Sequence, residues 1–375
     1  MSSENLVSVI VPTYNRAHLL PAALESALGQ SHPHVEVVVI DDGSTDNTKQ
    51  VVEPFLDRII YLETENGGPA HARNIGMRAA SGRYLAFLDS DDLYLPGKLA
   101  LQVAFMEAVP EIGLVSTEVS AFDESGVLEE YHLKSYHRIW RRMNLSYDEV
   151  YENSGEFEWE GRKEPVSYYL GNIFRYALMD TLISENTVFF RREVLDTVGF
   201  QNERYLYGQG YEWLLRVLKN YRAGFLNLPT YQLRYHRDQH SMCQAYPGDR
   251  TGVDPDADLK KQRILPHAGE TVLSAVLEWG CDDAEFYARN RSWLDRRVAE
   301  LYHSIGQGWM EIGNRKKARE SFRDGMKYDH RLGHNRRWFF WSFLPLKMRP
   351  LADRVEKGWH TFRARQERRR APSGS

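Results

Sequence analysis

The order of hydrophobic and polar residues in the first hundred positions predicts strands that alternate with helices. Short apolar runs have the length and the Val, Ile and Leu content of buried strands, and the segments between them place apolar side chains at helical spacing. The expected strands lie at residues 7–12, 35–40, 58–62 and 84–88, and the expected helices at residues 18–29, 46–55 and 69–80. This alternation predicts an α/β fold with a doubly wound, mainly parallel sheet.

Polar clusters follow three of the expected strands directly. They are Thr13-Tyr14-Asn15, Asp41-Asp42-Gly43-Ser44 and Asp89-Ser90-Asp91-Asp92. Ligands bind beyond the carboxyl ends of strands in doubly wound sheets, so we expect these clusters to share one crevice. Asp89 and Asp91 are two positions apart and point the same way on an extended backbone. Their oxygens suit Mg²⁺ or Mn²⁺, although aspartates here could instead cap a helix.

The loop at residues 65–76 adds a second candidate feature at this edge of the sheet. Gly67 and Gly68 permit a close approach of the backbone to a ligand. Arg73 would lie on the first turns of the following helix, where it could hold a phosphate or simply face solvent. The chain has neither the GxxxxGK[ST] motif of P-loop enzymes nor GxGxxG after its first strand, so a dinucleotide fold is not expected.

The second half of the chain has a different pattern. Residues 123–175 are rich in Tyr, Trp, Arg and Glu with little periodicity, and we interpret them as an insertion that lines an acceptor site or builds a satellite core. Residues 246–258 predict a linker, residues 259–345 a helical domain and residues 346–375 a basic tail. One helix pair has the spacing of a tetratricopeptide unit, carried by Tyr302, Ile305, Gly306, Trp309, Gly313, Ala318, Phe322 and Gly325.

Composition describes an ordinary globular chain and excludes several classes of function. The 375 residues are 42% hydrophobic and 27% charged, enough for two or three structural units. The formal net charge of −4 argues against a general nucleic-acid binder. Two cysteines are too few for a disulfide framework or a zinc site. The start of the chain has no signal-peptide pattern and no apolar run approaches the ~20 residues of a membrane span, so we expect a cytoplasmic protein.

Basic charge is concentrated near the end of the chain. Residues 331–370 contain twelve Lys or Arg and three Asp or Glu, with Trp and Phe among them. Basic residues beside these aromatic side chains favour peripheral contact with an anionic membrane. A solvated basic helix end next to a buried aromatic patch would give the same pattern.

Four segments, taken in order, resemble family 2 glycosyltransferases. They are VSVIVPTYNR at residues 7–16, VIDDGS at 39–44, GGPAHARNIG at 67–76 and LDSDD at 88–92. A weaker resemblance continues to about residue 245 through ENTVFFRR at 185–192 and RYH at 234–236. The resemblance implies a GT-A fold and an inverting enzyme over residues 1–245, with a nucleotide-binding half at 5–100 and an acceptor half at 101–245.

The resemblance also implies roles for individual residues. Thr13, Tyr14 and Asp41 or Asp42 would contact the base and ribose, and Arg73 the diphosphate. Asp89 and Asp91 would bind ribose and metal, with His236 near the metal and diphosphate. Pro12, Asn15 and Ser90 would complete the nucleotide-sugar site. The implied activity is transfer of a sugar from a nucleoside diphosphate-sugar to a hydroxyl of a glycan or lipid-linked acceptor, with Mn²⁺ or Mg²⁺ as cofactor.

One departure from the family pattern concerns the general base. The family has Glu-Asp at the start of its catalytic helix, and this chain has Gln209-Gly210. Glu212 is the nearest carboxylate and is the candidate base. Alternatively an acceptor of lower pKa needs no base, or the chain binds donor with little turnover. A sugar-nucleotide-binding scaffold and a protein or peptide glycosyltransferase therefore stay open as rival functions.

Overall fold

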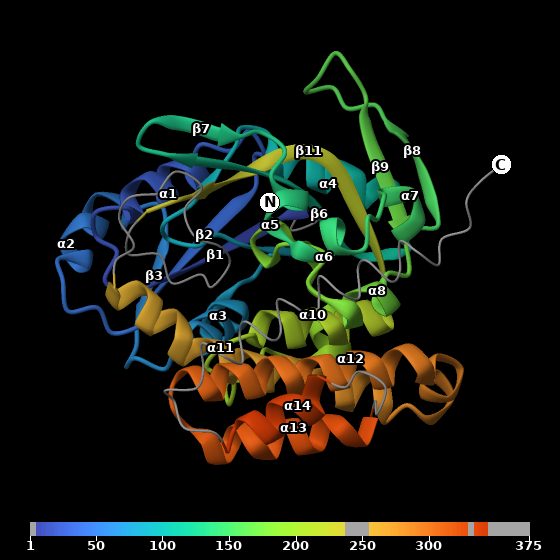
Figure 1. The fold of residues 1–375 in the computed structure, drawn as a ribbon. Helices are drawn as coiled ribbons and strands as arrows, with labels where there is room; N and C mark the ends of the chain where they lie inside the picture. The colour runs from blue at the N-terminus through green and yellow to red at the C-terminus, as the bar shows by residue number, and fades with distance from the viewer. Residues whose placement is uncertain (1–4, 237–254, 329–333, 344–375) are drawn as a thin grey trace.

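The computed structural model describes residues 5–236, 255–328 and 334–343. Its centre is an eleven-stranded sheet in the order β3-β2-β1-β4-β10-β6-β11-β9-β8, in which β5 pairs with β11 and β7 with β6. Figure 1 shows the C-terminal helices stacked beneath α10, on the side away from the sheet. The strands are β1 (Val7–Thr13), β2 (Val35–Asp41), β3 (Ile60–Glu63), β4 (Tyr84–Phe87), β5 (Leu93–Tyr94), β6 (Ile112–Asp123), β7 (Gly126–Glu129), β8 (Asn153–Phe157), β9 (Val166–Gly171), β10 (Phe189–Arg191) and β11 (Arg222–Arg234).

The first four strands pair in parallel, and each matches an expected apolar run. In β1, which lies between β2 and β4, Val9 is opposite Val37 on one side and Ala86 on the other. Every residue of β4 is buried, as expected for a strand covered on both faces. Together with the helices between them, these strands confirm the predicted α/β fold.

The other half of the sheet is mixed. β10 runs antiparallel to both β4 and β6, while β11 is parallel to β6 and antiparallel to β9. β8 and β9 lie inside the segment 123–175, which has little periodicity, and they add two strands to the sheet. The interpretation of this segment as an insertion that lines an acceptor site stays a prediction. β8 is an edge strand with no fully buried residue, so its sequence lacks a clear strand pattern.

Fourteen α-helices surround the sheet or follow it in the described residues. Two 3₁₀ turns (Glu53–Phe55 and Glu185–Thr187) and one π-helical turn (Leu277–Cys281) also occur. The helices are α1 (Leu20–Leu28), α2 (Thr48–Val52), α3 (Pro69–Ala79), α4 (Lys98–Ala108), α5 (Leu133–Tyr136), α6 (Arg138–Arg142), α7 (Tyr147–Val150), α8 (Phe174–Met179), α9 (Val194–Val198), α10 (Gln209–Asn220), α11 (Pro255–Val276), α12 (Ala284–Glu311), α13 (Arg315–Tyr328) and α14 (His334–Trp341).

The expected helical C-terminal region is confirmed. α12 and α13 form the anticipated helix pair, with Gly313 at a φ of 83° in the turn between them. Phe322 of α13 packs so closely on Gly306 of α12 that a Cβ there would overlap its ring. Assignment of this pair as a tetratricopeptide unit stays a prediction. α11 begins inside the expected linker 246–258, and residues 246–254 and the tail from 346 onward lie outside the described residues.

The C-terminal helices pack against the domain that carries the sheet. The Tyr205 hydroxyl lies 3.0 Å from the Ser274 hydroxyl of α11, and Lys219 of α10 lies 3.1 Å from the Asp283 carboxylate.

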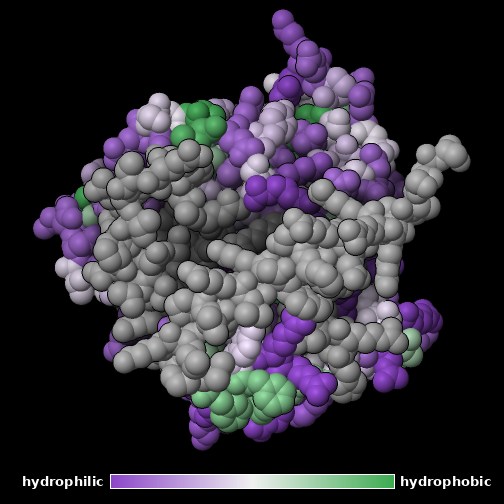
Figure 2. Space-filling view, viewed as in Figure 1, coloured by the Kyte–Doolittle hydropathy of each residue, from purple (hydrophilic) through white to green (hydrophobic). Residues whose placement is uncertain are grey.

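Hydrophobic residues gather on the surface over β7 and α14 (Figure 2), including Val127 and Phe340, which are 63% and 59% exposed. None of the helices in the described ranges is long and apolar enough to cross a bilayer.

Candidate active site

The polar clusters that follow β1, β2 and β4 lie at one edge of the sheet. The parallel register places Thr13 opposite Asp41 at the ends of β1 and β2. Beyond β4, the Leu88 N–H donates to the Ile10 carbonyl, so Asp89 emerges at the same edge. The structure therefore brings these clusters together, as the topology predicts.

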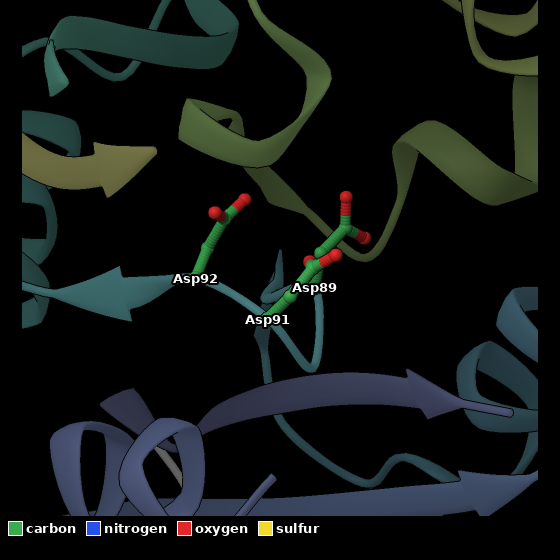
Figure 3. A group of neighbouring side chains, drawn as sticks. All are labelled: Asp89, Asp91 and Asp92. Atoms are coloured by element: carbon green, nitrogen blue, oxygen red, sulfur yellow. The ribbon is translucent and has the colours of Figure 1, made fainter. Parts of the chain in front are cut away.

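Asp89, Asp91 and Asp92 form a group of carboxylates that could share a cation. One oxygen of each lies within 4.8 Å of the others. In Figure 3 the Asp89 and Asp91 side chains lie next to each other, whereas Asp92 projects apart from them. Oxygen donors of this kind fit Mn²⁺ or Mg²⁺.

Two basic side chains lie beside Asp91. His236 Nε2 is 3.1 Å from Asp91 Oδ2, and Arg16 Nε is 3.7 Å from the same oxygen. Burial raises the pKa of Asp91, but the hydrogen bond and charge of His236, together with the charge of Arg16, hold that pKa below its usual value. Asp91 is therefore ionised beside His236, and the roles of both as metal ligands stay a prediction.

Asp92 attaches the aspartate loop to β11. Its Oδ2 accepts a 2.6 Å hydrogen bond from the Tyr231 hydroxyl, and its Oδ1 accepts a 2.7 Å bond from the Arg234 N–H. Burial and then the charges of Asp91 and Asp89 raise the pKa of Asp92 well above its usual value. Through these two hydrogen bonds Asp92 fixes the loop of residues 89–92 to β11.

Asp89 belongs to a chain of contacts that reaches Glu185. Arg73 Nη2 donates a 2.7 Å hydrogen bond to Asp89 Oδ1, and Asn186 Nδ2 donates one of 2.7 Å to Oδ2. Arg73 Nη1 lies 3.6 Å from Glu185 Oε2. Sequence reasoning missed Glu185 and Asn186 as site residues: the segment ENTVFFRR carries the weaker family resemblance, but its spacing alone assigns no role to either residue.

Arg73 is a buried organiser of carboxylates. Arg73 is 6% exposed. Burial alone would lower the pKa of its guanidinium, but the negative charges of Glu185 and Asp89 raise that pKa above its usual value. Its contact with a diphosphate stays a prediction, since the described guanidinium contacts are with Asp89 and Glu185.

Asp41 and Asp42 shape the loops beyond β2. Asp42 accepts hydrogen bonds of 2.9 Å from the N–H groups of Gly67 and Gly68. Burial raises the pKa of Asp42, against the effect of these two bonds. Asp41 accepts a 2.7 Å hydrogen bond from the Tyr61 hydroxyl. Asp42 thus fixes the loop at Gly67 and Gly68, while Asp41 joins the end of β2 to Tyr61 of β3.

The remaining expected nucleotide-binding residues lie at the same edge. Tyr14 is 41% exposed, and its contact with a base stays a prediction. Thr13 is buried, and its Oγ1 has no hydrogen-bond partner among the described residues. Asn15 Oδ1 accepts a 2.7 Å hydrogen bond from the Thr45 N–H, which closes this part of the loop. The members of this group are Pro12, Thr13, Tyr14, Asn15 and Ser90.

A comparison with protein families decides the relationship of this chain. The model described as glycosyl transferase family 2 matches residues 8–197, a little over half of the 375 residues. The chain belongs to glycosyl transferase family 2. The resemblance inferred from the motifs is thereby confirmed.

Curated family 2 relatives align with this chain over a short segment. TuaG of Bacillus subtilis, a putative teichuronic acid biosynthesis glycosyltransferase, is 46% identical over 106 residues, which are 27% of this chain and 42% of TuaG. WfgD of Escherichia coli, a UDP-Glc:alpha-D-GlcNAc-diphosphoundecaprenol beta-1,3-glucosyltransferase, is 45% identical over 105 residues, 28% of this chain and 42% of WfgD. An uncharacterized glycosyltransferase of Rickettsia bellii is 48% identical over 103 residues, 27% of this chain and 15% of that relative. The alignments thus span less than half of each relative.

Solved structures show the same fold. TarS 1–349 of S. aureus, in complex with UDP-GlcNAc, superposes with a TM-score of 0.55 at 20% sequence identity. The superposition covers 90% of this chain and 89% of that one. The GT-A fold expected for family 2 is therefore confirmed.

In this family 2 chain the candidate base Glu212 is 3% exposed and ion-paired. Arg216 donates to both of its oxygens, at 2.8 Å from Nε and 3.0 Å from Nη2. Trp279 Nε1 also donates to Glu212 Oε1 at 3.3 Å, and Arg216 Nη2 donates to the Phe200 carbonyl. These contacts brace α10 against its neighbours, and a role for Glu212 as base stays a prediction.

Proposed function

We propose that this protein is a metal-dependent inverting glycosyltransferase that moves a sugar from a nucleoside diphosphate-sugar to a hydroxyl group. The observation that carries the proposal is the pairing of Asp89 and Asp91 at the carboxyl edge of a parallel sheet, in a chain of glycosyl transferase family 2. Carboxylates at this place can bind a cation together with the phosphates of a ligand.

Different residues at the carboxyl edge of the sheet would bind different parts of the nucleotide-sugar. The exposed Tyr14 ring would contact the base, and Asp41 and Asp42 would orient the ribose and the adjoining loop. Asp89 and Asp91 would hold Mn²⁺ or Mg²⁺, with His236 beside them. When bound, the metal would neutralise charge on the leaving diphosphate.

The named relatives suggest which ligands to test first. WfgD is named for a UDP-glucose donor and a diphosphoundecaprenol-linked acceptor, and TarS was solved with UDP-GlcNAc. We extend this to the present chain as a proposal: the donor is a UDP-sugar and the acceptor a glycan or lipid-linked glycan.

We also propose that the basic, aromatic C-terminal segment contacts an anionic membrane. In its described part, Arg336 and Phe340 are both exposed and lie four positions apart on α14, so they share one face. Co-sedimentation with phosphatidylglycerol vesicles at low salt, released as salt rises, is the expected result. Protein that stays in the supernatant at low salt would contradict it.

A ligand screen tests the transferase proposal directly. Thermal unfolding of the protein with UDP and GDP, each with and without Mn²⁺, should show a metal-dependent rise in Tm for one nucleotide. The matching UDP- or GDP-sugar should then be hydrolysed slowly with Mn²⁺. Binding without hydrolysis or transfer would instead support the sugar-nucleotide-binding scaffold.

A further inference from the structure

Glu185 places a largely buried carboxylate in the candidate active site. It lies in the 3₁₀ turn Glu185–Thr187 just before β10, and its side chain is 17% exposed. Its Oε1 accepts a hydrogen bond from Gln201 Nε2. Its Oε2 lies 3.6 Å from Arg73 Nη1, beyond ordinary hydrogen-bond length. One oxygen is thus fixed, and the other remains able to accept a proton.

Gly210 provides the room in which this carboxylate lies. Gly210 is in the first turn of α10, and a Cβ at this position would overlap the Glu185 carboxylate group. The family resemblance places an aspartate at position 210. The carboxylate of Glu185 therefore occupies the space into which a side chain at position 210 would project.

Three other carboxylates near this edge are already bonded through both oxygens. A fourth, Asp91, is paired through Oδ2 with His236 and Arg16. Asp92 accepts from Tyr231 and Arg234, as described above. Asp89 accepts from Arg73 and Asn186, and Glu212 is held by Arg216.

The surroundings of Glu185 also favour proton uptake. Burial raises the pKa of Glu185 above its usual value, partly offset by the charge of Arg73. A carboxylate with a raised pKa is a stronger base at neutral pH.

We propose that Glu185 is the catalytic carboxylate of this chain and takes over the role that Gly210 cannot fill. The acceptor oxygen forms a bond to the anomeric carbon as the bond from that carbon to the diphosphate oxygen breaks. The bonding electron pair leaves with the diphosphate, and the proton of the acceptor hydroxyl passes to Glu185 Oε2. The inference rests on the transferase function proposed above.

The test exchanges the position of the carboxylate. Wild type is compared with four variants: Glu185→Gln, Glu185→Asp, Gly210→Asp and the double variant Glu185→Ala/Gly210→Asp. Glu152→Gln is the control for loss of a charge, because the Glu152 side chain is 57% exposed. Hydrolysis of UDP-glucose, UDP-N-acetylglucosamine and GDP-mannose is measured with Mn²⁺. UDP and GDP affinity is measured by calorimetry, and folding by Tm.

Glu185→Gln should lower hydrolysis of the active donor at least 100-fold, while the Kd of its nucleoside diphosphate changes less than threefold. Glu185→Asp keeps the charge beside Arg73 and should retain wild-type Tm with hydrolysis reduced at least tenfold. Gly210→Asp alone should hydrolyse the donor more slowly than wild type, because the new side chain would overlap the Glu185 carboxylate. The double variant should exceed Glu185→Gln in hydrolysis at least tenfold.

Two different failures can be told apart. If Glu185→Gln and Glu185→Asp both hydrolyse the donor within fivefold of wild type, Glu185 is not the catalytic carboxylate, and the transferase proposal stands. If wild type neither binds a nucleoside diphosphate nor hydrolyses any of the three donors, the transferase proposal fails and the assignment of Glu185 fails with it.

Discussion

Arg73 and Asp89 are joined by a 2.7 Å hydrogen bond from Nη2 to Oδ1, although they belong to different elements, α3 and the loop after β4. The Arg73 side chain is 7% exposed and also lies 5.6 Å from the centre of the Phe87 ring. A buried guanidinium between Asp89 and Glu185 lets two acidic side chains lie in one small volume, because it offsets their mutual repulsion.

Replacement of Arg73 by Met should therefore lower the free energy of unfolding by ~3–5 kcal/mol, the usual cost of leaving buried charges without their partner. Urea unfolding followed by circular dichroism measures the change. Arg78→Met on the same helix is the matched control, because Arg78 is 53% exposed and should contribute less than ~1 kcal/mol. Equal losses in the two variants would contradict the proposed role of Arg73.

Asp91→Asn should abolish Mn²⁺-dependent binding of UDP, because a neutral amide is a weaker ligand for a divalent cation than a carboxylate. It should leave the Tm close to that of wild type, because the amide oxygen can still accept a hydrogen bond from His236. Asp92→Asn should affect stability more than Mn²⁺-dependent binding of UDP. It should lower the Tm, because the Asp92 carboxylate holds Tyr231 and Arg234 inside the protein. Calorimetry with UDP, with and without Mn²⁺, together with thermal unfolding of both variants, distinguishes the two roles. Unchanged UDP affinity in Asp91→Asn would remove this residue from the metal site.

Gly210→Ala should lower the free energy of unfolding by ~1–3 kcal/mol, the range for inserting a methyl group into a packed site. In a Glu185→Ala background the same change should become neutral or stabilising by up to ~1 kcal/mol, because alanine favours a helix more than glycine does. A double-mutant cycle in urea measures this coupling. Additive effects would show that Gly210 and Glu185 do not share space.

Lys98 provides a test of pH dependence. It is fully buried, and burial lowers its pKa to about 7. Between about pH 7 and the ordinary pKa of 10.5 the unfolded chain binds the proton that folded Lys98 has lost, so the free energy of unfolding should rise with pH. Lys98→Met removes this term. Its stability relative to wild type should fall by up to ~1.4 kcal/mol per pH unit from pH 7.5 to 9, measured by urea unfolding. A difference that is constant with pH would contradict the assignment.

The sequence predicted the parallel half of the sheet because its information is local. The strands Val7–Thr13, Val35–Asp41 and Tyr84–Phe87 are mostly apolar runs, and aspartates follow the second and third of them. Topology alone then places Asp41 and Asp89 at the same edge. These parts of the fold and site follow from the spacing of hydrophobic residues and from the polar residues that directly follow each strand.

The contacts that complete the site depend on residues far apart in sequence. Glu185 reaches Arg73 through tertiary packing, and a short turn before a three-residue strand gives no pattern from which to infer it. The ion pair of Glu212 with Arg216 was within reach of sequence reasoning, because side chains four positions apart on a helix are neighbours. β8 was missed because an edge strand with no fully buried residue has no alternation of burial to detect.

The contact of Trp279 with Glu212 ties the C-terminal helices to the helix that begins beside Glu185. Lys219 reinforces the same junction through Asp283. A chimera that joins this N-terminal domain to the C-terminal helices of another family member would therefore need to carry matching junction residues. Such exchanges should be designed with the break after β11, and with Trp279 and Asp283 kept as the partners of Glu212 and Lys219.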